Sequence, residues 1–268
     1  MESILDAKPS KLFTCYLDYC EEAGADRSVV KDTAERTVLH MKSGSPPADL
    51  GEVTERRWYG SLESGKPDWS VYFGDYYLAE AWVCWAVYSR QYLKRLCEPG
   101  HLKDTHESAV SAMGEVKSVL DLGCGAGITT AALTQLFPGA DVVGTNLDGT
   151  TQAEVSRRYG KAYGFNVCAS PTGEADVVFA SEYFEHIVSP IVHLREVLEV
   201  SQPTFFIFAN TFNQKAVGHF PCYSVDGGWV AGSKLPRMFG AELKRRRFRK
   251  VRTKFWNGRP SIWVRVRE

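Results

Sequence analysis

Strand and helix patterns alternate along the chain after residue 112, and this alternation restricts the fold more than any other feature. Short apolar runs typical of buried strands are separated by stretches with helical periodicity. The predicted strands are 117–122, 140–146, 164–168, 175–181 and 203–210, and the predicted helices are 128–137, 150–163 and 189–200. Because helical crossovers connect parallel strands, this order predicts an α/β fold with a doubly wound, mostly parallel sheet covered by helices on both faces.

The end of the chain predicts a helix over 236–247 followed by a β-hairpin. The two strands of this hairpin cover 249–256 and 261–267, and the sequence NGRP joins them. We expect this antiparallel terminal hairpin to complete one edge of the sheet.

Residues 1–112 form an N-terminal helical region, or lid, that precedes the sheet-forming domain of residues 113–268. A loop rich in turn formers is predicted over 43–51. From Asp75 to Leu96 apolar side chains recur near the helical period, which predicts one amphipathic helix whose aromatic stripe packs on the main domain. The alternative is that aromatic residues just before this helix or at its start cover a ligand. The candidates for that role are Tyr72, Phe73, Tyr76 and Tyr77.

The sequence VLDLGCGAGITT, residues 119–130, places three glycines where the first predicted strand ends and a helix begins. In a doubly wound sheet, ligands bind beyond the carboxyl ends of the strands, so this first loop is the expected binding site. Glycine lets a ligand approach main-chain N–H groups near the positive end of the following helix. A dinucleotide site has the spacing GxGxxG, whereas this loop has the spacing GxGxG and is preceded by Asp121.

The segment DLGCGAG, residues 121–127, resembles the first motif of the class I S-adenosylmethionine-dependent methyltransferases. The resemblance continues through VVGTN, residues 142–146, and through residues 175–200, which are similar to a subgroup that includes ubiquinone-type and small-molecule methyltransferases. It extends over roughly residues 115–268 and implies a seven-stranded doubly wound sheet with one antiparallel strand, which the predicted hairpin fits. S-adenosylmethionine is the implied cofactor. The residues that the resemblance places at this cofactor are Asp121, Gly123, Cys124, Gly125, Gly127, Asn146, Leu147 and Glu182.

The chain departs from the family pattern near the cofactor. Its second strand ends in Asn146, with Asp148 two residues on, where the family has an acid that accepts hydrogen bonds from both ribose hydroxyls. An amide oxygen accepts such a bond without the charge that strengthens it. The sequence CAS at 168–170 replaces an Asp often found beside the adenine, and SQPT at 201–204 replaces the usual kPGG turn. We therefore expect Asn146 at the ribose with weaker polar anchoring, and tighter cofactor binding in an Asn146→Asp variant.

Methyl transfer to a poor nucleophile such as a hydroxyl needs a base. The resemblance places Glu182 of the segment SEYFEHI at the methionine end of the cofactor or at the substrate. Tyr183 in the same segment, and His219 after the fifth strand, are further catalytic candidates. We expect Glu185 and His186 to be structural, orienting this loop and capping the next helix.

The same segment has the Glu-x-x-Glu-His spacing that binds a divalent metal in small-RNA 2′-O-methyltransferases. The ligands would be Glu182, Glu185 and His186, with His219 completing the set. Because many relatives carry these residues without a metal, we predict no metal, with this set as the alternative.

Seven cysteines without CxxC or paired ligand spacing argue against a cysteine zinc site and predict reduced thiols. The chain starts without the long apolar run of a signal peptide, and its longest apolar stretch, 78–88, carries Glu80 and is too short to span a bilayer. We therefore expect a cytoplasmic protein without a membrane association.

The formal net charge is zero, but basic residues gather at the end of the chain. From Lys234 to Glu268 there are thirteen Lys or Arg and two acids, so this segment carries +11 and the rest of the chain −11. It either binds a polyanion or forms a solvated face with an edge strand that resists aggregation. Its densest part begins with Lys244, Arg245, Arg246 and Arg247.

We expect methyl transfer to a small metabolite or nucleotide. One alternative is a methyltransferase that acts on DNA or RNA through the basic segment, although the chain lacks the Pro-Pro motif of exocyclic-amine DNA methyltransferases. Pro221-Cys222 follows the fifth strand, whereas cytosine-C5 enzymes carry their Pro-Cys nucleophile after the fourth. The other alternative is a catalytically silent protein of the same fold that binds cofactor or nucleic acid.

Overall fold

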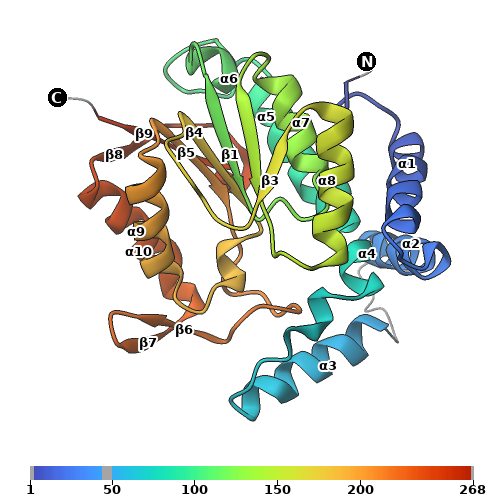
Figure 1. Ribbon diagram of the computed structural model, residues 1–268. Coiled ribbons are helices and arrows are strands. Elements are labelled where there is room, and N and C mark those ends of the chain that lie inside the picture. Colours follow the sequence, from blue (N-terminus) through green and yellow to red (C-terminus); the bar gives the residue numbers. More distant parts are fainter. Residues whose placement is uncertain (1–2, 44–49, 267–268) are drawn as a thin grey trace.

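A computed structural model describes residues 3–43 and 50–266. In these residues seven strands form one sheet in the order β3-β2-β1-β4-β5-β9-β8, with helices on both faces (Figure 1). The strands are β1 (Ser118–Leu122), β2 (Asp141–Thr145), β3 (Asn166–Cys168), β4 (Val177–Ser181), β5 (Phe205–Ala209), β8 (Phe248–Lys250) and β9 (Ser261–Arg265). Neighbours up to β5 pair in parallel, whereas β9 is antiparallel to both β5 and β8. The predicted fold class is confirmed, including the antiparallel terminal hairpin at the sheet edge.

Residues of the central strands feed two cores, one on each face of the sheet. In β4, Val177 and Phe179 belong to the core on the side of α7 and α8, while Val178 and Ala180 belong to the core on the side of α9 and α10. Successive side chains of a strand point to opposite faces, so a continuous apolar run suits a sheet covered on both sides. The helices are α7 (Ile128–Leu136), α8 (Thr151–Tyr163), α9 (Pro190–Ser201) and α10 (Leu235–Arg245).

The N-terminal region is helical and shares the core of the α7 and α8 face. Its helices are α1 (Pro9–Glu22), α2 (Arg27–Ser43), α3 (Leu50–Glu63), α4 (Asp75–Cys84), α5 (Arg90–Cys97) and α6 (Ala109–Ala112). A π-helical segment, Trp85–Ser89, connects α4 to α5, so the helix predicted over Asp75–Leu96 is present as one stretch with a widened turn. Most of the loop predicted over 43–51 lies outside the described residues. Among the described helices, none has the length and apolar character required to cross a bilayer.

The strand order places a topological switch point between β1 and β4. From β1 the chain continues outward to β2 and β3 and then returns to β4 on the other side. Loops that leave these two strands diverge at their carboxyl ends, and the crevice between them is where doubly wound sheets bind ligands. The glycine loop and the segment SEYFEHI both start at this crevice.

The first strand of the terminal hairpin is shorter than predicted. It pairs over Phe248–Lys250, the Val251 N–H still donates to the Ile262 carbonyl, and residues 252–255 then turn to the loop that follows α5. There the Lys103 N–H donates to the Arg252 carbonyl and the Lys254 N–H donates to the His101 carbonyl. These backbone groups find partners outside the hairpin, which ends the pairing with β9.

A second hairpin, β6 (Cys222–Val225) and β7 (Gly228–Ala231), was not predicted. Asp226 and Gly227 join its strands with φ of 47° and 84°. Two left-handed central residues are typical of the tight turn that Asp-Gly favours between antiparallel strands. The dipeptide was therefore a usable signal in the sequence.

Candidate functional site

A cavity of about 240 Å³ lies at the switch point, between the sheet and the N-terminal region. Its lining on the sheet side comes from the glycine loop, the end of β4, the segment after β5 and the turn before β9. Residues of α2, α4 and the π-helical segment close it from the other side. The lining of the sheet side includes Gly123, Cys124, Gly125, Glu182, His219 and Arg259.

The three glycines of the loop have different roles, although all have positive φ. Gly125 lines the cavity, and a Cβ placed there would meet no atom within 4 Å, so the loop backbone is open to a ligand. Gly123 also lines the cavity, but a Cβ would lie 2.2 Å from the ring of Tyr183. A Cβ on Gly127 would lie 2.9 Å from the backbone of Ser156. Gly127 therefore serves helix packing, while Gly125 gives access to the main chain.

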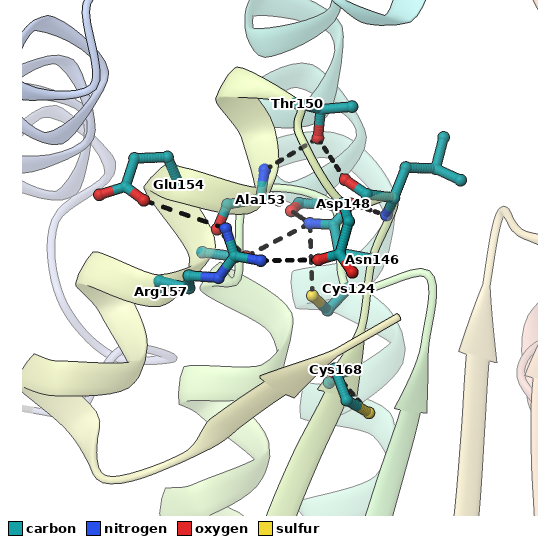
Figure 2. Close-up of polar contacts among 12 residues, drawn as sticks. Cys124, Asn146, Asp148, Thr150, Ala153, Glu154, Arg157 and Cys168 are labelled. Carbon is teal, nitrogen blue, oxygen red and sulfur yellow. Dashed lines mark hydrogen bonds and ion pairs between the residues drawn. The ribbon is translucent and has the colours of Figure 1, made fainter. Parts of the chain in front are cut away.

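Asn146 holds the glycine loop with its side chain (Figure 2). The Nδ2 group donates to the Gly125 carbonyl at 2.6 Å and to Ser156 Oγ at 3.3 Å, while Oδ1 accepts from the Leu147 N–H at 2.9 Å. The side chain is buried, and Asn146 is not among the described residues that line the cavity. The structure therefore places the amide on the loop itself, where the sequence led us to expect it at the ribose.

The residues after Asn146 turn the chain into α8. Leu147 is 54% exposed, and the Asp148 carboxylate accepts from Arg157 at 2.7 Å on the surface (Figure 2). Thr150 caps α8 by accepting from the Ala153 N–H. The acid two residues after Asn146 is thus already paired with a guanidinium.

Asp121 is buried at the end of β1 and accepts a hydrogen bond from Thr130 Oγ1 at 2.6 Å. Burial raises the pKa of this carboxyl to about 7. Its contact with Thr130 ties the strand to the first turn of α7, so Asp121 supports the loop from below the cavity.

Glu182 is the acid at the end of β4 that lines the cavity. Its φ is 49°, and its N–H donates to the Ala209 carbonyl at 2.8 Å. Burial, together with the charge of Glu185, raises the pKa of Glu182 well above its ordinary value. The carboxyl of Glu185 accepts from Asn210 Nδ2 and from the Thr211 N–H. Glu185 thus fastens the chain after β5, which agrees with its expected structural role, and Glu182 is the acid of this pair that lines the cavity.

His186 and His219 meet edge to face across the cavity wall, with ring centroids 4.8 Å apart. Tyr72 Oη and His186 Nδ1 lie 2.7 Å apart, and burial followed by the neighbouring His219 lowers the pKa of His186 to about 4. His219 Nδ1 lies 2.9 Å from the Gln214 carbonyl, an acceptor, so Nδ1 carries the proton. Of the two ring nitrogens of His219, Nε2 is then the one with a free lone pair that can accept a proton.

The four residues of the metal alternative do not form a ligand cluster. Among the described residues, no group of three or more His, Cys, Asp or Glu side chains is arranged to hold a metal ion. Both carboxyl oxygens of Glu185 already accept hydrogen bonds, and His186 Nδ1 is engaged by Tyr72.

Tyr183 turns toward α9 on the far side of the glycine loop. Its hydroxyl lies 2.8 Å from His193 Nε2, and its ring covers Gly123. Within the described residues it is absent from the cavity lining, so the structure brings Glu182 and His219 together and leaves Tyr183 outside.

Aromatic residues of the N-terminal region cover the cavity. Of the four candidates, Tyr76 and Tyr77 line it, Tyr72 contacts His186, and Phe73 is 50% exposed. Helix α3 reaches the His219 segment as well: Trp58 Nε1 donates to the His219 carbonyl at 2.8 Å. The N-terminal region therefore positions the segment that carries His219.

Two charged residues of the cavity were not proposed as site residues. Glu80 lines it from α4, and burial together with the charge of Glu55 raises the pKa of Glu80 to about 7. Arg259 lines it from the turn before β9, with Nη1 2.7 Å from Thr211 Oγ1. The sequence signals for these two residues are a single acid in an apolar helix, for Glu80, and an arginine in a turn at the carboxyl edge of the sheet, for Arg259.

Known proteins share sequence and fold with this chain. A family model described as a methyltransferase domain matches residues 88–252. The ubiquinone biosynthesis O-methyltransferase of Nitrosospira multiformis is 28% identical over 131 residues, 45% of this chain and 53% of that protein. The protein of the same name from Bordetella avium is 30% identical over 126 residues, 43% of this chain and 50% of that protein.

The chain spans about half the length of the curated relatives it matches. Among solved structures, an O-methyltransferase family protein from Burkholderia thailandensis has a TM-score of 0.56 at 12% identity, over 88% of this chain and 71% of that chain. At this identity the likeness is one of fold.

Proposed function

Because the chain belongs to the methyltransferase domain family, whose class I members use S-adenosylmethionine, we propose that it transfers the cofactor's methyl group to an oxygen of a small acceptor. The observation that carries this proposal is one cavity that brings together the open glycine loop, Glu182 and His219. The loop lies at the switch point, where the fold binds its ligand.

The residues of the glycine loop fit the cofactor. Gly125 leaves its main chain open toward the cavity, and Gly127 is the N-cap of α7, whose N-terminus carries a partial positive charge. The sulfonium of S-adenosylmethionine activates the methyl group, so the protein has to align the acceptor and remove its proton. Cys124 and Gly123 extend the same wall of the cavity.

His219 is the proposed base. Its Nε2 takes the proton of the acceptor hydroxyl while that oxygen forms a bond to the methyl carbon and the carbon–sulfur bond breaks. The electron pair of the broken bond stays on sulfur, which becomes a neutral thioether. Glu182 lines the same cavity, and burial raises its pKa well above the ordinary value, which favours a hydrogen bond from its carboxyl group to another oxygen of the methyl acceptor.

The size of the cavity supports a small acceptor, because helices of the N-terminal region close it and its volume is about 240 Å³. The names of the curated relatives support an oxygen nucleophile, since both are O-methyltransferases of ubiquinone biosynthesis. Tyr76, Tyr77 and Tyr88 would provide apolar faces for a planar acceptor.

The test is methyl transfer from labelled S-adenosylmethionine to a set of small phenols and catechols, with His219→Ala as the variant. We expect turnover to fall about 10²- to 10⁴-fold, the usual contribution of a general base, while S-adenosylhomocysteine binds within about threefold of wild type. His106→Ala, at an exposed histidine outside the cavity lining, is the control. Full activity in His219→Ala would refute the role of the base, and no turnover by wild type would favour a catalytically silent protein.

Transfer to a polynucleotide is the second candidate, and the position of the basic segment weighs against it. Phe248 pairs with Arg265, whose N–H donates to the carbonyl of Thr204 just before β5 begins. Arg247 therefore lies at the amino edge of the sheet, opposite the cavity. Arg245 and Arg246 each pair with Glu242 in addition.

A triple variant, Arg245→Gln with Arg246→Gln and Arg247→Gln, separates the two substrate classes. For a small acceptor we expect unchanged turnover and no salt-dependent affinity for DNA or RNA. Binding to nucleic acid that falls steeply with salt and is lost in the triple variant would support the polynucleotide candidate.

A further inference from the structure

Arg259 is a cation inside a cavity that is otherwise neutral or acidic. Among the described residues that line the cavity, it is the single Lys or Arg. Glu80 and Glu182, the acids of the lining, have raised pKa values because they are buried. The positive charge of Arg259 acts on Glu182 in the opposite sense and lowers its pKa, although burial has the larger effect.

Neutral groups hold the Arg259 side chain in place. Its Nη1 donates to Thr211 Oγ1 at 2.7 Å. The Arg259 carbonyl accepts from Arg95 Nη1 at 2.9 Å, which fixes the backbone as well. Within the described part of the chain, no carboxylate oxygen is paired with the guanidinium at 4.0 Å or less. A preoriented guanidinium without an ion-pair partner is well suited to bind an anion.

The position of Arg259 in the sheet favours the acceptor over the cofactor as the source of that anion. Ser261, at the start of β9, pairs with Phe208 near the carboxyl end of β5, so Arg259 lies on the β5 side of the cavity. The glycine loop follows β1, three strand spacings from β9, which corresponds to roughly 14 Å. The His219 segment follows β5 and lies on the same side as Arg259.

We propose that Arg259 binds an anionic group, a carboxylate or a phosphate, of the methyl acceptor. The proposal rests on the methyltransferase function proposed above and narrows its substrate class to small acids that also carry a hydroxyl. The guanidinium would hold the anion at the β5 side, so that the hydroxyl is presented to His219 and to the methyl group. The methionine carboxylate of the cofactor is the competing source of the anion, and the experiment separates the two.

The experiment measures the binding of matched probes to the complex with S-adenosylhomocysteine. One pair is 3,4-dihydroxybenzoate and its neutral amide, 3,4-dihydroxybenzamide, and the second pair is phenyl phosphate and phenol. The variant is Arg259→Gln, and the control is Arg252→Gln, which removes the same charge from an exposed position of the same segment. Binding of S-adenosylhomocysteine alone is measured for each protein.

We expect wild type and Arg252→Gln to bind at least one anionic probe about 10- to 100-fold more tightly than its neutral partner, the range of a charge-assisted hydrogen bond. Arg259→Gln should remove this difference and leave the affinity for S-adenosylhomocysteine within about threefold. Equal affinities for both members of each pair in wild type, including no binding of any probe, would overturn the proposal. The proposal would also be overturned if Arg259→Gln weakened the binding of S-adenosylhomocysteine as much as it weakened the binding of the anionic probe.

Turnover distinguishes failure of this proposal from failure of the proposed function. If wild type methylates 3,4-dihydroxybenzamide as well as the benzoate, methyl transfer stands and the anion site is wrong. If neither compound nor any other small phenol is methylated, the proposed function fails together with it.

Discussion

At the scale of single residues, the glycine loop offers a matched pair of substitutions. Gly125 and Gly139 both have positive φ and open space where a Cβ would stand, but Gly139 lies in the turn after α7, away from the cavity. Gly125→Val and Gly139→Val should lose comparable stability, because valine is strained in the left-handed region. Calorimetry with S-adenosylhomocysteine should show binding abolished in Gly125→Val alone. Unchanged affinity in Gly125→Val would mean that the loop does not hold the cofactor.

Asn146 makes a second prediction at this scale, and it reverses what the sequence led us to expect. In Asn146→Asp, an oxygen would replace the Nδ2 group that donates to the Gly125 carbonyl, so two acceptors would face each other. We expect the dissociation constant of S-adenosylhomocysteine to rise about tenfold or more, corresponding to a loss on the order of 1–3 kcal/mol. Asp148→Asn, at the surface pair with Arg157, should leave the affinity within about threefold. Tighter binding by Asn146→Asp would show that residue 146 reaches the ribose after all.

At the scale of elements, α3 contacts the segment of the proposed base, His219, through one hydrogen bond. Trp58 is fully buried and donates to the carbonyl of His219. Trp58→Phe keeps most of the apolar volume but leaves that buried carbonyl unpaired, at a cost of about 1–3 kcal/mol. We expect a lower melting temperature together with a lower kcat at unchanged S-adenosylhomocysteine affinity. The control is Trp69→Phe, at a partly exposed residue whose ring contacts Trp58. This variant should affect neither kcat nor cofactor binding.

The π-helical segment is the part of the N-terminal region that joins α4 to α5 beside the cavity. Trp85, Tyr88 and Ser89 of this segment line the cavity, and Ser89 Oγ lies 3.2 Å from Ser181 Oγ at the end of β4. A widened turn shifts the residues that follow it around the helix axis, so that α5 can pack on the sheet domain while the segment itself faces the cavity.

At the scale of the whole molecule, the acids of the cavity make stability depend on pH. Glu80 has a pKa of about 7 in the folded protein and an ordinary value of 4.5. The folded state therefore binds this proton more tightly, and its stabilising effect is complete below pH 4.5 and is lost as the pH rises through 7. Glu80→Gln should match wild type near pH 4.5 and exceed it above pH 7 by on the order of 1–2 kcal/mol, with allowance for partial exposure.

Denaturant unfolding between pH 4.5 and pH 8 measures this difference. The control is Glu199→Gln, at an exposed position of α9, which should follow the wild-type profile at every pH. If Glu80→Gln also runs parallel to wild type over the whole range, Glu80 is ionised in the folded protein at neutral pH.

The sequence by itself determined the fold and indicated the loop that lines the cavity. Local patterns carry that information: the period of apolar residues distinguishes strand from helix, and alternation of the two leaves few arrangements of a sheet. DLGCGAG marks the loop at which such a sheet binds a ligand, and the structure places Gly123 and Gly125 at the cavity. The hairpin turn at Asp226-Gly227 is also a local signal, because this dipeptide favours a tight turn with two left-handed residues.

The tertiary structure alone decided which side chains share the cavity and what each is free to do. Arg259 and Thr211 are 48 residues apart, and Trp58 and His219 are 161 residues apart, so no periodicity relates them. The amide of Asn146 donates to the Gly125 carbonyl because the ends of β1 and β2 are neighbours in the sheet. Residues at the carboxyl ends of strands meet only when the sheet forms, and burial there then decides which acids keep their protons.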